Sequence, residues 1–491
     1  MRPILSMRQP ALATINAVQS RQGLCATSAV AIVVLILSGC AAVGPDYRPP
    51  QTPVPAQWQG THDGGARDAA VLARWWRQFN DPVLDGLIAD ALSANTDLAT
   101  AQAKLREARA RRDLARAGLG ASVTASGSAS RSEGSGATRN LVSAGFDASW
   151  EPDVFGGTRR GVEAAEADLQ ASTEALRDTR VSLVAEVARN VVELRTSERR
   201  LAIAEASLAA QKETYDLTRW RQMAGLVSQL DEAQALTELE RTRAGLPSLG
   251  TAIAEARNRL AILLGRPPGE LDVRLSINGA IPIATDAVAT GIPADTLRQR
   301  PDVRAAERRL AAQTARLGEA EAARYPSFRL SGSLGLESLV LNRLLSGSTG
   351  TGSLLAGITA PIFDAGRIRS NIAVQDALLE QNRLGYQAAV LTALEEVENA
   401  LVSLANARQR QAQLARATDS ARSAMEIARN RYTAGLADFQ AVLESQRTLL
   451  NLEDQLTSGT ADISNAQIRL YKALGGGWTT DAAPADSKET P

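Results

Sequence analysis

The chain contains two copies of one sequence pattern. Ala224-Gly225-Leu226 recurs as Ala434-Gly435-Leu436, 210 positions later, and the heptad-like apolar positions before each triplet recur at the same offset. Further back, Asn95-Thr96-Asp97-Leu98 aligns with Arg300-Pro301-Asp302-Val303 at an offset of 205. Because self-similarity at a fixed offset indicates a repeated structural unit, we predict that the chain folds as two copies of one unit.

The two copies divide the chain. The turn 157–160 is aligned with 366–369 at an offset of 209, between the offsets of 205 and 210. Each copy is predicted to hold a helix, two strands and then a long helix pair. The predicted division is 71–265 for the first repeat, 266–294 for an inter-repeat linker, equatorial in the sense that it lies midway along the predicted helices, and 295–475 for the second repeat.

The long helices are predicted from apolar spacing and from the absence of proline. Apolar residues follow a 3,4,3 spacing that is typical of coiled-coil packing, at Val184, Val187, Val191 and Leu194. No proline interrupts 162–223 or 367–434, so each segment is long enough for a rod of roughly 90–100 Å at 1.5 Å per residue. One hairpin of that length cannot bury its own apolar stripe, so neighbouring copies must cover it.

Four segments alternate apolar residues with small or polar ones. They are 122–130, 142–150, 327–337 and 353–362, and turn-rich loops are expected at 131–140 and 345–353. Such alternation is typical of transmembrane β-barrel strands around a polar interior, although a soluble sheet with one wet face alternates too. The long coiled-coil helices favour the barrel, because they leave a soluble sheet without a core partner.

The number of strands predicts the assembly. Outer-membrane barrels begin at eight strands, so four per chain are too few for one chain to close a barrel. Three chains supply twelve strands and twelve long helical segments. The predicted fold class is an α+β membrane protein, internally duplicated, with a trimeric 12-stranded transmembrane β-barrel continuous with a long periplasmic α-helical coiled-coil barrel.

The N-terminus has the pattern of a lipoprotein signal. Arg2, Arg8 and Arg21 precede a nine-residue apolar run at 29–37, which is too short to span a bilayer. The run ends in Leu37-Ser38-Gly39-Cys40, which resembles a lipobox. We predict a signal peptide at 1–39 and lipidation of Cys40; the alternative is an ordinary secretory signal with an incidental cysteine.

The residues after Cys40 predict a location and a tether. Ala41 and Ala42 stand where an Asp would retain a lipoprotein in the inner membrane, so the outer membrane is expected. The proline-rich segment within 40–70 is predicted to be a lipidated N-terminal tether. At the other end, 476–491 is rich in Gly, Ala, Asp and Pro and is predicted to be a disordered tail.

The residue inventory argues against an enzyme or a nucleic-acid-binding protein. Lys+Arg and Asp+Glu are both 54, so the chain carries no basic excess for nucleic acid. The one histidine, His62, provides no triad or multi-histidine metal site, and Cys40 is the one cysteine left in the mature chain. No Walker-type phosphate loop is present. We predict no catalytic residues, no metal site and no cofactor, with energy supplied by a partner.

Several motifs together resemble one family. They are Leu37-Ser38-Gly39-Cys40 with Gly44-Pro45-Asp46-Tyr47, Trp75-Trp76 with Asp81-Pro82, Arg300-Pro301-Asp302-Val303, Pro361-Ile362-Phe363-Asp364, and the paired Ala-Gly-Leu tips. On these motifs, across nearly the whole mature chain, the sequence resembles the outer-membrane efflux protein family, TolC-like, in its NodT-type lipoprotein branch.

The resemblance implies a homotrimeric, passive exit duct in the outer membrane. Such ducts dock a periplasmic adaptor and an energised inner-membrane transporter of the RND type, and export drugs or other small amphiphiles. Adaptor contact is implied for the helix tips, at Gly225, Leu226, Val227, Gly435, Leu436 and Ala437.

The resemblance also implies a periplasmic gate. Glu444 stands where the family often has an Asp lining the narrowest ring, and Asp231 and Tyr432 stand at positions of gate-closing polar partners. Asp438 is a further acidic tip residue. Ala437 departs from the family, which has a basic residue there, so a gate salt bridge at that position is not expected. For Glu444 and Asp231 the alternative is a solvated helix face.

Two other functions stay open from the sequence. One is a duct of the same fold for metal-ion export or type I protein secretion. The other is a periplasmic lipoprotein adaptor or coiled-coil scaffold, against which the duplicated hairpin argues. Trp75 and Trp76 are interpreted as packing anchors of the first helix in preference to lipid-interface residues.

Overall fold

A computed structural model describes residues 42–50, 53–59, 69–134, 137–275, 279–284, 293–345 and 349–478. The predicted signal peptide, Cys40, His62 and residues 479–491 lie outside this part of the chain. The described chain is mostly helical and contains one antiparallel sheet, β1 (Ser122–Gly134), β2 (Ala137–Trp150), β3 (Ser327–Ser338) and β4 (Gly350–Thr359).

The chain forms two compact units, and each draws on both sequence repeats. The first unit comprises the segments up to Arg48, Ala110–Ala167 and Ala311–Glu380, and therefore contains the sheet. The second comprises Pro49–Arg109, Asp168–Leu310 and the chain from Gln381 onward, and contains the helical hairpins.

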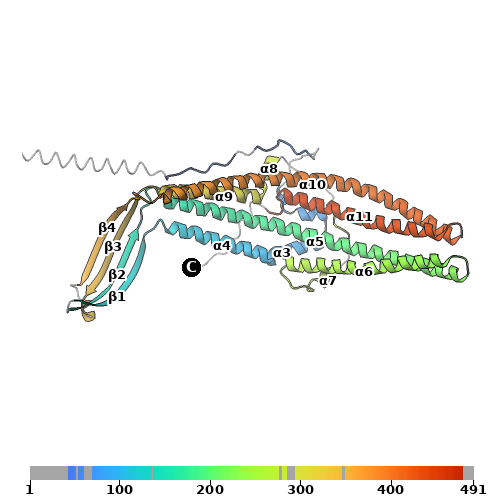
Figure 1. The fold of residues 1–491 in the computed structure, drawn as a ribbon, viewed down its shortest axis with the longest axis horizontal. Coiled ribbons are helices and arrows are strands. Elements are labelled where there is room, and N and C mark those ends of the chain that lie inside the picture. The colour runs from blue at the N-terminus through green and yellow to red at the C-terminus, as the bar shows by residue number, and fades with distance from the viewer. Residues whose placement is uncertain are drawn as a thin grey trace, which may run out of the picture. The chain divides into compact units, whose positions relative to one another are not determined.

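The sheet of the first unit has the strand order β1-β2-β3-β4, with antiparallel neighbours throughout (Figure 1). The register pairs Ser128 with Ser143, Ser143 with Glu337, and Ser333 with Ser353, so polar residues of all four strands share one face. Within the described chain, β1 and β4 are each paired along one side only. The sheet is therefore open at both edges in a single chain.

The two faces of the sheet differ as the alternation predicts. On the polar face, serine hydroxyls bond across strands, with 2.9 Å between the Oγ atoms of Ser128 and Ser143 and 2.7 Å between those of Ser333 and Ser353. On the other face, large apolar side chains are exposed in the single chain, at Val123, Phe146, Leu334, Leu354 and Ile358. Neither face is covered by a core from the described residues of the same chain.

Three details of the prediction for the strands and for the turns that follow them are wrong. The first hairpin has no long loop at 131–140, because β1 continues to Gly134 and β2 begins at Ala137. The fourth strand ends at Thr359 and not at Ile362, since Pro361 lacks the N–H that a ladder needs. The turn offset is 210 and not 209, because Gly156 and Gly366 are the matching left-handed residues, with φ of 81° and 83°.

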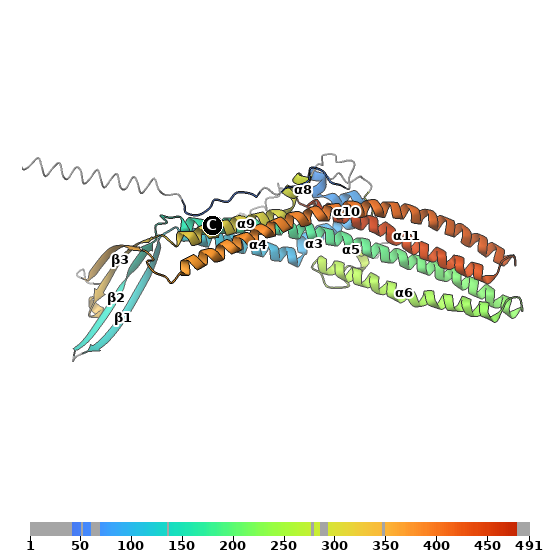
Figure 2. The ribbon, with the colours of Figure 1, turned by 45° about the horizontal axis from the view of Figure 1, so that its top comes forward.

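Two helical hairpins make up most of the second unit, although the first residues of their long helices belong to the first unit (Figure 2). They are α5 (Gly157–Met223) with α6 (Gln229–Leu263), and α10 (Arg367–Thr433) with α11 (Phe439–Ala473). Helices α5 and α10 each run for 67 residues, which confirms the predicted uninterrupted rods. The predicted heptad positions from Val184 to Leu194 are buried in the main core of this unit.

The remaining elements are short or precede the strands. They are α2 (Ala69–Ala73), η1 (Trp75–Phe79), α3 (Pro82–Ala94), α4 (Thr96–Ala117), α7 (Asp272–Leu275), α8 (Pro293–Gln299), α9 (Pro301–Ala322) and η2 (Leu341–Arg343). Trp75 is fully buried and stacks on Tyr471 with 5.0 Å between ring centroids. Trp76 packs edge-on against Trp75, so both tryptophans are packing anchors, as interpreted from the sequence.

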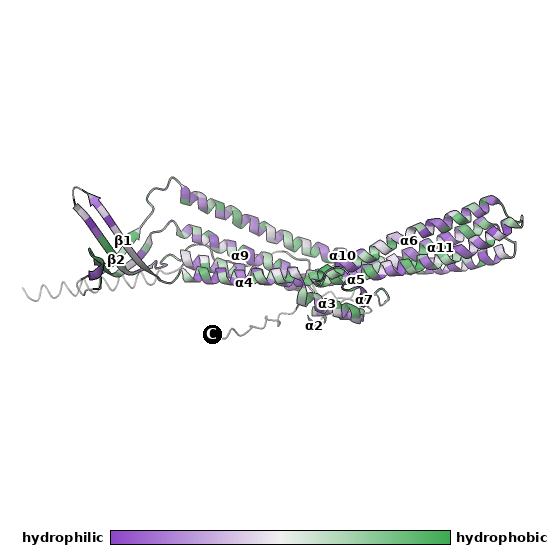
Figure 3. Ribbon diagram, turned by 90° about the horizontal axis from the view of Figure 1, so that it is seen from below, coloured by the Kyte–Doolittle hydropathy of each residue, from purple (hydrophilic) through white to green (hydrophobic). Residues whose placement is uncertain are grey.

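The described helices carry no candidate membrane span. Along each long helix, hydrophilic and hydrophobic residues are interspersed, without an extended apolar run (Figure 3).

At equivalent positions of the two repeats, different side chains bond to the end of a long hairpin helix. Asn95 caps α4 by accepting from the Leu98 N–H (2.9 Å), and its amide donates to the Leu263 carbonyl at the end of α6 (2.9 Å). In the second repeat, Arg300 precedes α9 and donates to the Ala473 carbonyl at the end of α11 (3.0 Å). Each aligned motif therefore ties the start of one helix to the end of a distant one.

Replacing Asn95 with Ala is expected to lower the free energy of unfolding by about 1–2 kcal/mol, because one helix cap and one buried carbonyl lose their partner. The measurement is thermal unfolding followed by the helical circular dichroism signal of the detergent-solubilised protein. Ser93→Ala, on the exposed side of α3, is the control, and equal melting of both variants would contradict the capping role.

Candidate functional site

The first helix tip joins α5 to α6 through a glycine-terminated cap. Gly225 has φ of 72°, a conformation that glycine adopts without steric cost. Its N–H donates to the Gln222 carbonyl (2.9 Å), and the Leu226 N–H donates to the Arg221 carbonyl (2.8 Å). This pair of bonds is a Schellman motif, which closes the end of α5 and places Leu226 beyond it.

The next helix begins with a reciprocal cap. The Ser228 hydroxyl accepts from the Asp231 N–H (3.2 Å), and the Asp231 carboxylate accepts from the Ser228 N–H (3.0 Å). The negative charge of Asp231 also lies in the first turn of α6, where the helix dipole favours an acid. In this chain, Asp231 therefore has a structural role as a capping residue.

The second tip repeats this construction between α10 and α11. Gly435 also has φ of 72°, and the Leu436 N–H donates to the Arg431 carbonyl (2.8 Å). Asp438 is the N-cap of α11 and accepts from the Ala441 N–H (3.1 Å). The two tips thus have the same backbone geometry, which rigidly presents the residues after each glycine.

The tips differ in the side chains that they expose. The side chains of Leu226 and Leu436 are 71% and 76% exposed, so each tip ends in a bare leucine. The first tip adds three further large apolar side chains that are exposed in the single chain, at Trp220, Met223 and Leu230. The corresponding residues of the second tip, 210 positions later, are Asn430, Thr433 and Gln440. The first tip is therefore the more apolar of the two.

Tyr432 is buried inside the tip region. Its side chain is 2% exposed and packs among Ala235, Phe439 and Leu443. The hydroxyl lies 3.2 Å from the Thr218 hydroxyl, which is a hydrogen-bond partner within this chain. Within one protomer the Tyr432 hydroxyl therefore pairs with Thr218, and the Asp231 carboxylate pairs with Ser228.

Arg221 is a tip residue that the sequence prediction did not select. Its guanidinium donates to the Tyr432 carbonyl (2.7 Å) and the Thr433 carbonyl (3.3 Å), and lies 4.6 Å from the centre of the Tyr432 ring. It therefore caps the C-terminus of α10 from the end of α5 and links the two hairpins. The repeat could not indicate this role, because Arg221 and its counterpart Arg431 look alike in the sequence.

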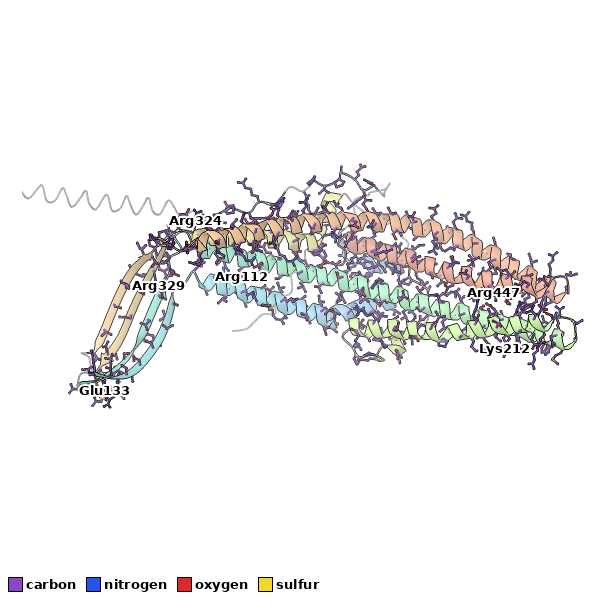
Figure 4. The ribbon with its side chains drawn as sticks, in the orientation of Figure 1. Arg112, Glu133, Lys212, Arg324, Arg329 and Arg447 are labelled. Carbon is purple, nitrogen blue, oxygen red and sulfur yellow. The ribbon has the colours of Figure 1, made fainter. Side chains whose placement is uncertain are left out.

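Ion pairs hold the hairpins together behind the tips. Glu238 of α6 is almost fully buried and accepts from Arg447 of α11 (2.8 Å) and from Arg241 (2.7 Å). Figure 4 shows Arg447 on α11 and Lys212 on α5, both toward the hairpin ends. Because each buried carboxylate needs a partner, this bond fixes α11 against α6.

Glu444 projects away from this packed region. Its neighbours Val442 and Leu443 are buried in the small tip core, whereas Glu444 itself is exposed on α11. The carboxylate is thus available to a second chain or to solvent. Among the described residues, no cluster of three or more potential metal ligands is present.

Solved structures match this arrangement. The outer-membrane channel OprN superposes with a TM-score of 0.84 at 35% identity, over 89% of this chain and 100% of that one. The open state of the outer-membrane channel MtrE of Neisseria gonorrhoeae superposes with a TM-score of 0.82 at 28% identity, over 89% and 99%. A four-stranded sheet joined to two long helical hairpins is thus the protomer fold of an outer-membrane channel.

Sequence comparisons then identify the family. The outer membrane efflux protein model matches residues 87–266 and 292–476, and the chain belongs to this family. It is 32% identical to Nodulation protein T of Rhizobium leguminosarum bv. trifolii, over 90% of this chain and 96% of that protein. It is also 32% identical to the toluene efflux pump outer membrane protein TtgC of Pseudomonas putida, over 94% and 98%.

Family membership confirms the main predictions from the sequence. The chain is an efflux channel of the outer membrane that extends into the periplasm, and it is not an enzyme. The predicted fold class is confirmed by the likeness to solved channels.

Proposed function

We propose that the protein is the passive exit duct of a tripartite efflux pump, which conducts drugs or other small amphiphiles from an inner-membrane transporter to the exterior. The observation that carries this proposal is the sheet, which is open at both edges and exposed on both faces in one chain. A sheet of this kind needs other chains and an apolar medium to become stable.

Three chains satisfy both needs. Pairing β4 of one chain with β1 of the next closes a 12-stranded barrel, with the apolar face toward lipid and the serine-rich face toward the lumen. The same symmetry gathers twelve long helical segments into a periplasmic tunnel, and the apolar residues exposed on α10, such as Leu391 and Val402, gain neighbours.

The tips are the proposed contact with the periplasmic adaptor. Gly225, Leu226 and Val227 in one hairpin and Gly435, Leu436 and Ala437 in the other present a bare leucine on a rigid turn. Exposed apolar side chains on a rigid support are typical of protein docking sites. The energy source is assigned to an inner-membrane RND-type transporter, which the adaptor joins to the duct.

Lipidation of Cys40 is proposed as a second attachment to the outer membrane. The support is the lipobox-like Leu37-Ser38-Gly39-Cys40 and the short apolar run before it. Metabolic labelling with radioactive palmitate tests it, because labelled wild type beside unlabelled Cys40→Ser would assign the acyl group to that residue.

For the lumen we propose an acidic ring at Glu444, with Asp231, Tyr432 and Asp438 as further gate residues. Three copies of Glu444 around the axis concentrate negative charge at one level, so the channel should prefer cations. In planar bilayers, Glu444→Ala is expected to reduce cation selectivity and the block by trivalent cations severalfold.

Glu426→Ala, an exposed glutamate farther back on α10, is the control for the conductance measurement. Discrete pores with unchanged selectivity in Glu444→Ala would reject the ring and keep the duct. Absence of pores in the wild type, together with a monomeric cross-linking pattern, would reject the duct itself.

A further inference from the structure

The peptide that follows Cys40 is bound to the turn between β2 and α5. The Val43 N–H donates to the carbonyl of Phe155, which lies in that turn (3.0 Å). Four residues farther along the tether, Tyr47 packs against Ala167 and Ala312. The start of the tether thus lies along the point where the sheet gives way to helices within the first unit.

Arg160 of α5 encloses this peptide. Its Nε donates to the Val43 carbonyl (3.1 Å), and one terminal nitrogen donates to the Gly44 carbonyl (3.1 Å) and to the Asp46 carboxylate (2.8 Å). The other terminal nitrogen donates to Glu163 (2.7 Å). The Arg160 side chain is 5% exposed. The hydrogen bonds of its guanidinium thus go to the tether and to the carboxylate of Glu163.

The charge of Arg160 is retained in this buried place. Burial by itself lowers the pKa of the guanidinium, but hydrogen bonds to Asp46 and Glu163 raise it above the usual value. Asp46 belongs to the tether, so the tether supplies part of the negative charge that raises the pKa of Arg160.

Glycines make room for the tether. A Cβ on Gly44 would lie 2.3 Å from the Cα of Gly318, and a Cβ on Gly156 would lie 2.5 Å from the Cβ of Ala42. Gly318 lies inside α9, where glycine weakens a helix by about 0.5–1 kcal/mol relative to alanine. Its presence there is explained by the backbone of the tether, which passes directly over it.

The second repeat provides an internal comparison. The left-handed glycines Gly156 and Gly366 match at an offset of 210, and so do the bonds that Arg160 and Ser370 donate to them through their N–H groups. Ser370 is exposed. The buried arginine is therefore present only in the repeat whose turn receives a tether, which separates its role from the folding of the turn itself.

We propose that Arg160 is a clasp that holds the start of the tether at the boundary between the sheet and the helices. The clasp places the acyl group beside the end of the transmembrane sheet, so that both insert into the same membrane together. This inference rests on the proposed lipidation of Cys40. Three residues of extended chain reach at most about 11 Å, so the point where a lipid is attached at residue 40 lies within that distance of Val43.

Hydrogen exchange of the full lipidated trimer in nanodiscs tests the clasp directly. Peptides that contain the Val43 amide are expected to exchange at least tenfold faster in Arg160→Ala than in the wild type. Arg160→Lys should lose protection too, because an ammonium group cannot reach several acceptors in a fixed fork. Arg369→Ala, which replaces an exposed arginine in the first turn of α10, should match the wild type. Retained protection in Arg160→Ala would overturn the clasp.

A second experiment tests whether the clasp serves the lipid. With Cys40 present, Arg160→Ala is expected to lower the assembled trimer in the outer membrane at least threefold. In Cys40→Ser produced with a non-lipoprotein secretory signal, Arg160→Ala should cause no further loss. Equal losses in both backgrounds, or no loss in either, would overturn the inference. Palmitate labelling of the wild type and of Arg160→Ala distinguishes the two proposals. If Arg160→Ala carries the label and its amount of trimer is unchanged, only the clasp is rejected. If the wild type carries no label, lipidation of Cys40 is rejected.

Discussion

Replacing Leu226 and Leu436 together with Asp is expected to abolish efflux while leaving the channel assembled in the outer membrane. Both leucines are exposed at the ends of closed Schellman turns, so neither supports the fold of its own chain. Burying a leucine at a partner surface contributes about 1.5–3 kcal/mol, and each trimer presents six such residues. Six charges in their place would remove that gain and impose a desolvation cost.

The measurement is dye accumulation and drug sensitivity in cells that carry the native adaptor and transporter. The double variant should behave like a deletion strain, and Leu226→Asp alone should be more damaging than Leu436→Asp, because the first tip is surrounded by Trp220 and Met223. Asn430→Asp with Thr433→Asp adds charge at the second tip without removing an apolar side chain, and serves as the control. Full efflux by the double variant with a normal amount of trimer would reject the tips as the docking site.

The elements of this fold could be predicted from the sequence because they depend on local periodicity. The alternation at 122–130 and the proline-free run at 162–223 each correspond to one element, and glycines mark the tips. The duplication also indicates which elements of the two repeats are equivalent. Strand ends were less predictable, since β4 ends where Pro361 interrupts the ladder, although the apolar alternation continues beyond it.

The side-chain partners could not be predicted in the same way. The contact of Arg160 with Val43 joins residues 117 positions apart, and that of Tyr432 with Thr218 joins residues 214 apart. Neither depends on a local pattern. Asp231 differs, because its bond to Ser228 spans three residues and follows a local capping pattern.

Arg300 links the start of α9 to α10 and to the end of α11. Its removal is expected to destabilise the protein in a pH-dependent way. Its guanidinium is 8% exposed and donates to both oxygens of Asp302 (3.0 and 2.6 Å), and it pairs with Glu396 (2.7 Å). It also satisfies the Ala473 carbonyl at the end of α11. Arg300→Ala should lower the free energy of unfolding by about 2–3 kcal/mol at neutral pH, because two carboxylates and one buried carbonyl lose their partner. The loss is not larger because both carboxylates stay partly exposed to water.

The sign of the pH dependence follows from two carboxylates. Burial raises the pKa of Asp302, but the hydrogen bonds and charge of Arg300 outweigh it and hold the pKa below the usual value. This stabilisation is present above the unfolded pKa of about 4 and is lost as the pH falls through the lower folded value. Asp178 differs, because burial and the nearby charge of Asp302 raise its pKa although Lys472 and Arg300 oppose the rise.

The melting difference between wild type and Arg300→Ala should therefore be largest near pH 7 and shrink as the pH falls from about 4 toward the lowered pKa of Asp302, where that carboxylate loses its charge. Asp178 in the variant loses a neighbouring cation, so its pKa should rise further and the variant should gain stability on mild acidification. Circular dichroism melting across pH measures both effects. Asp302→Asn should remove most of the pH-dependent difference, and Arg106→Ala, on the exposed side of α4, should melt like the wild type. A difference that stays constant from about pH 7 to about pH 3 would show that Arg300 acts through packing and the Ala473 carbonyl, and not through its ion pairs.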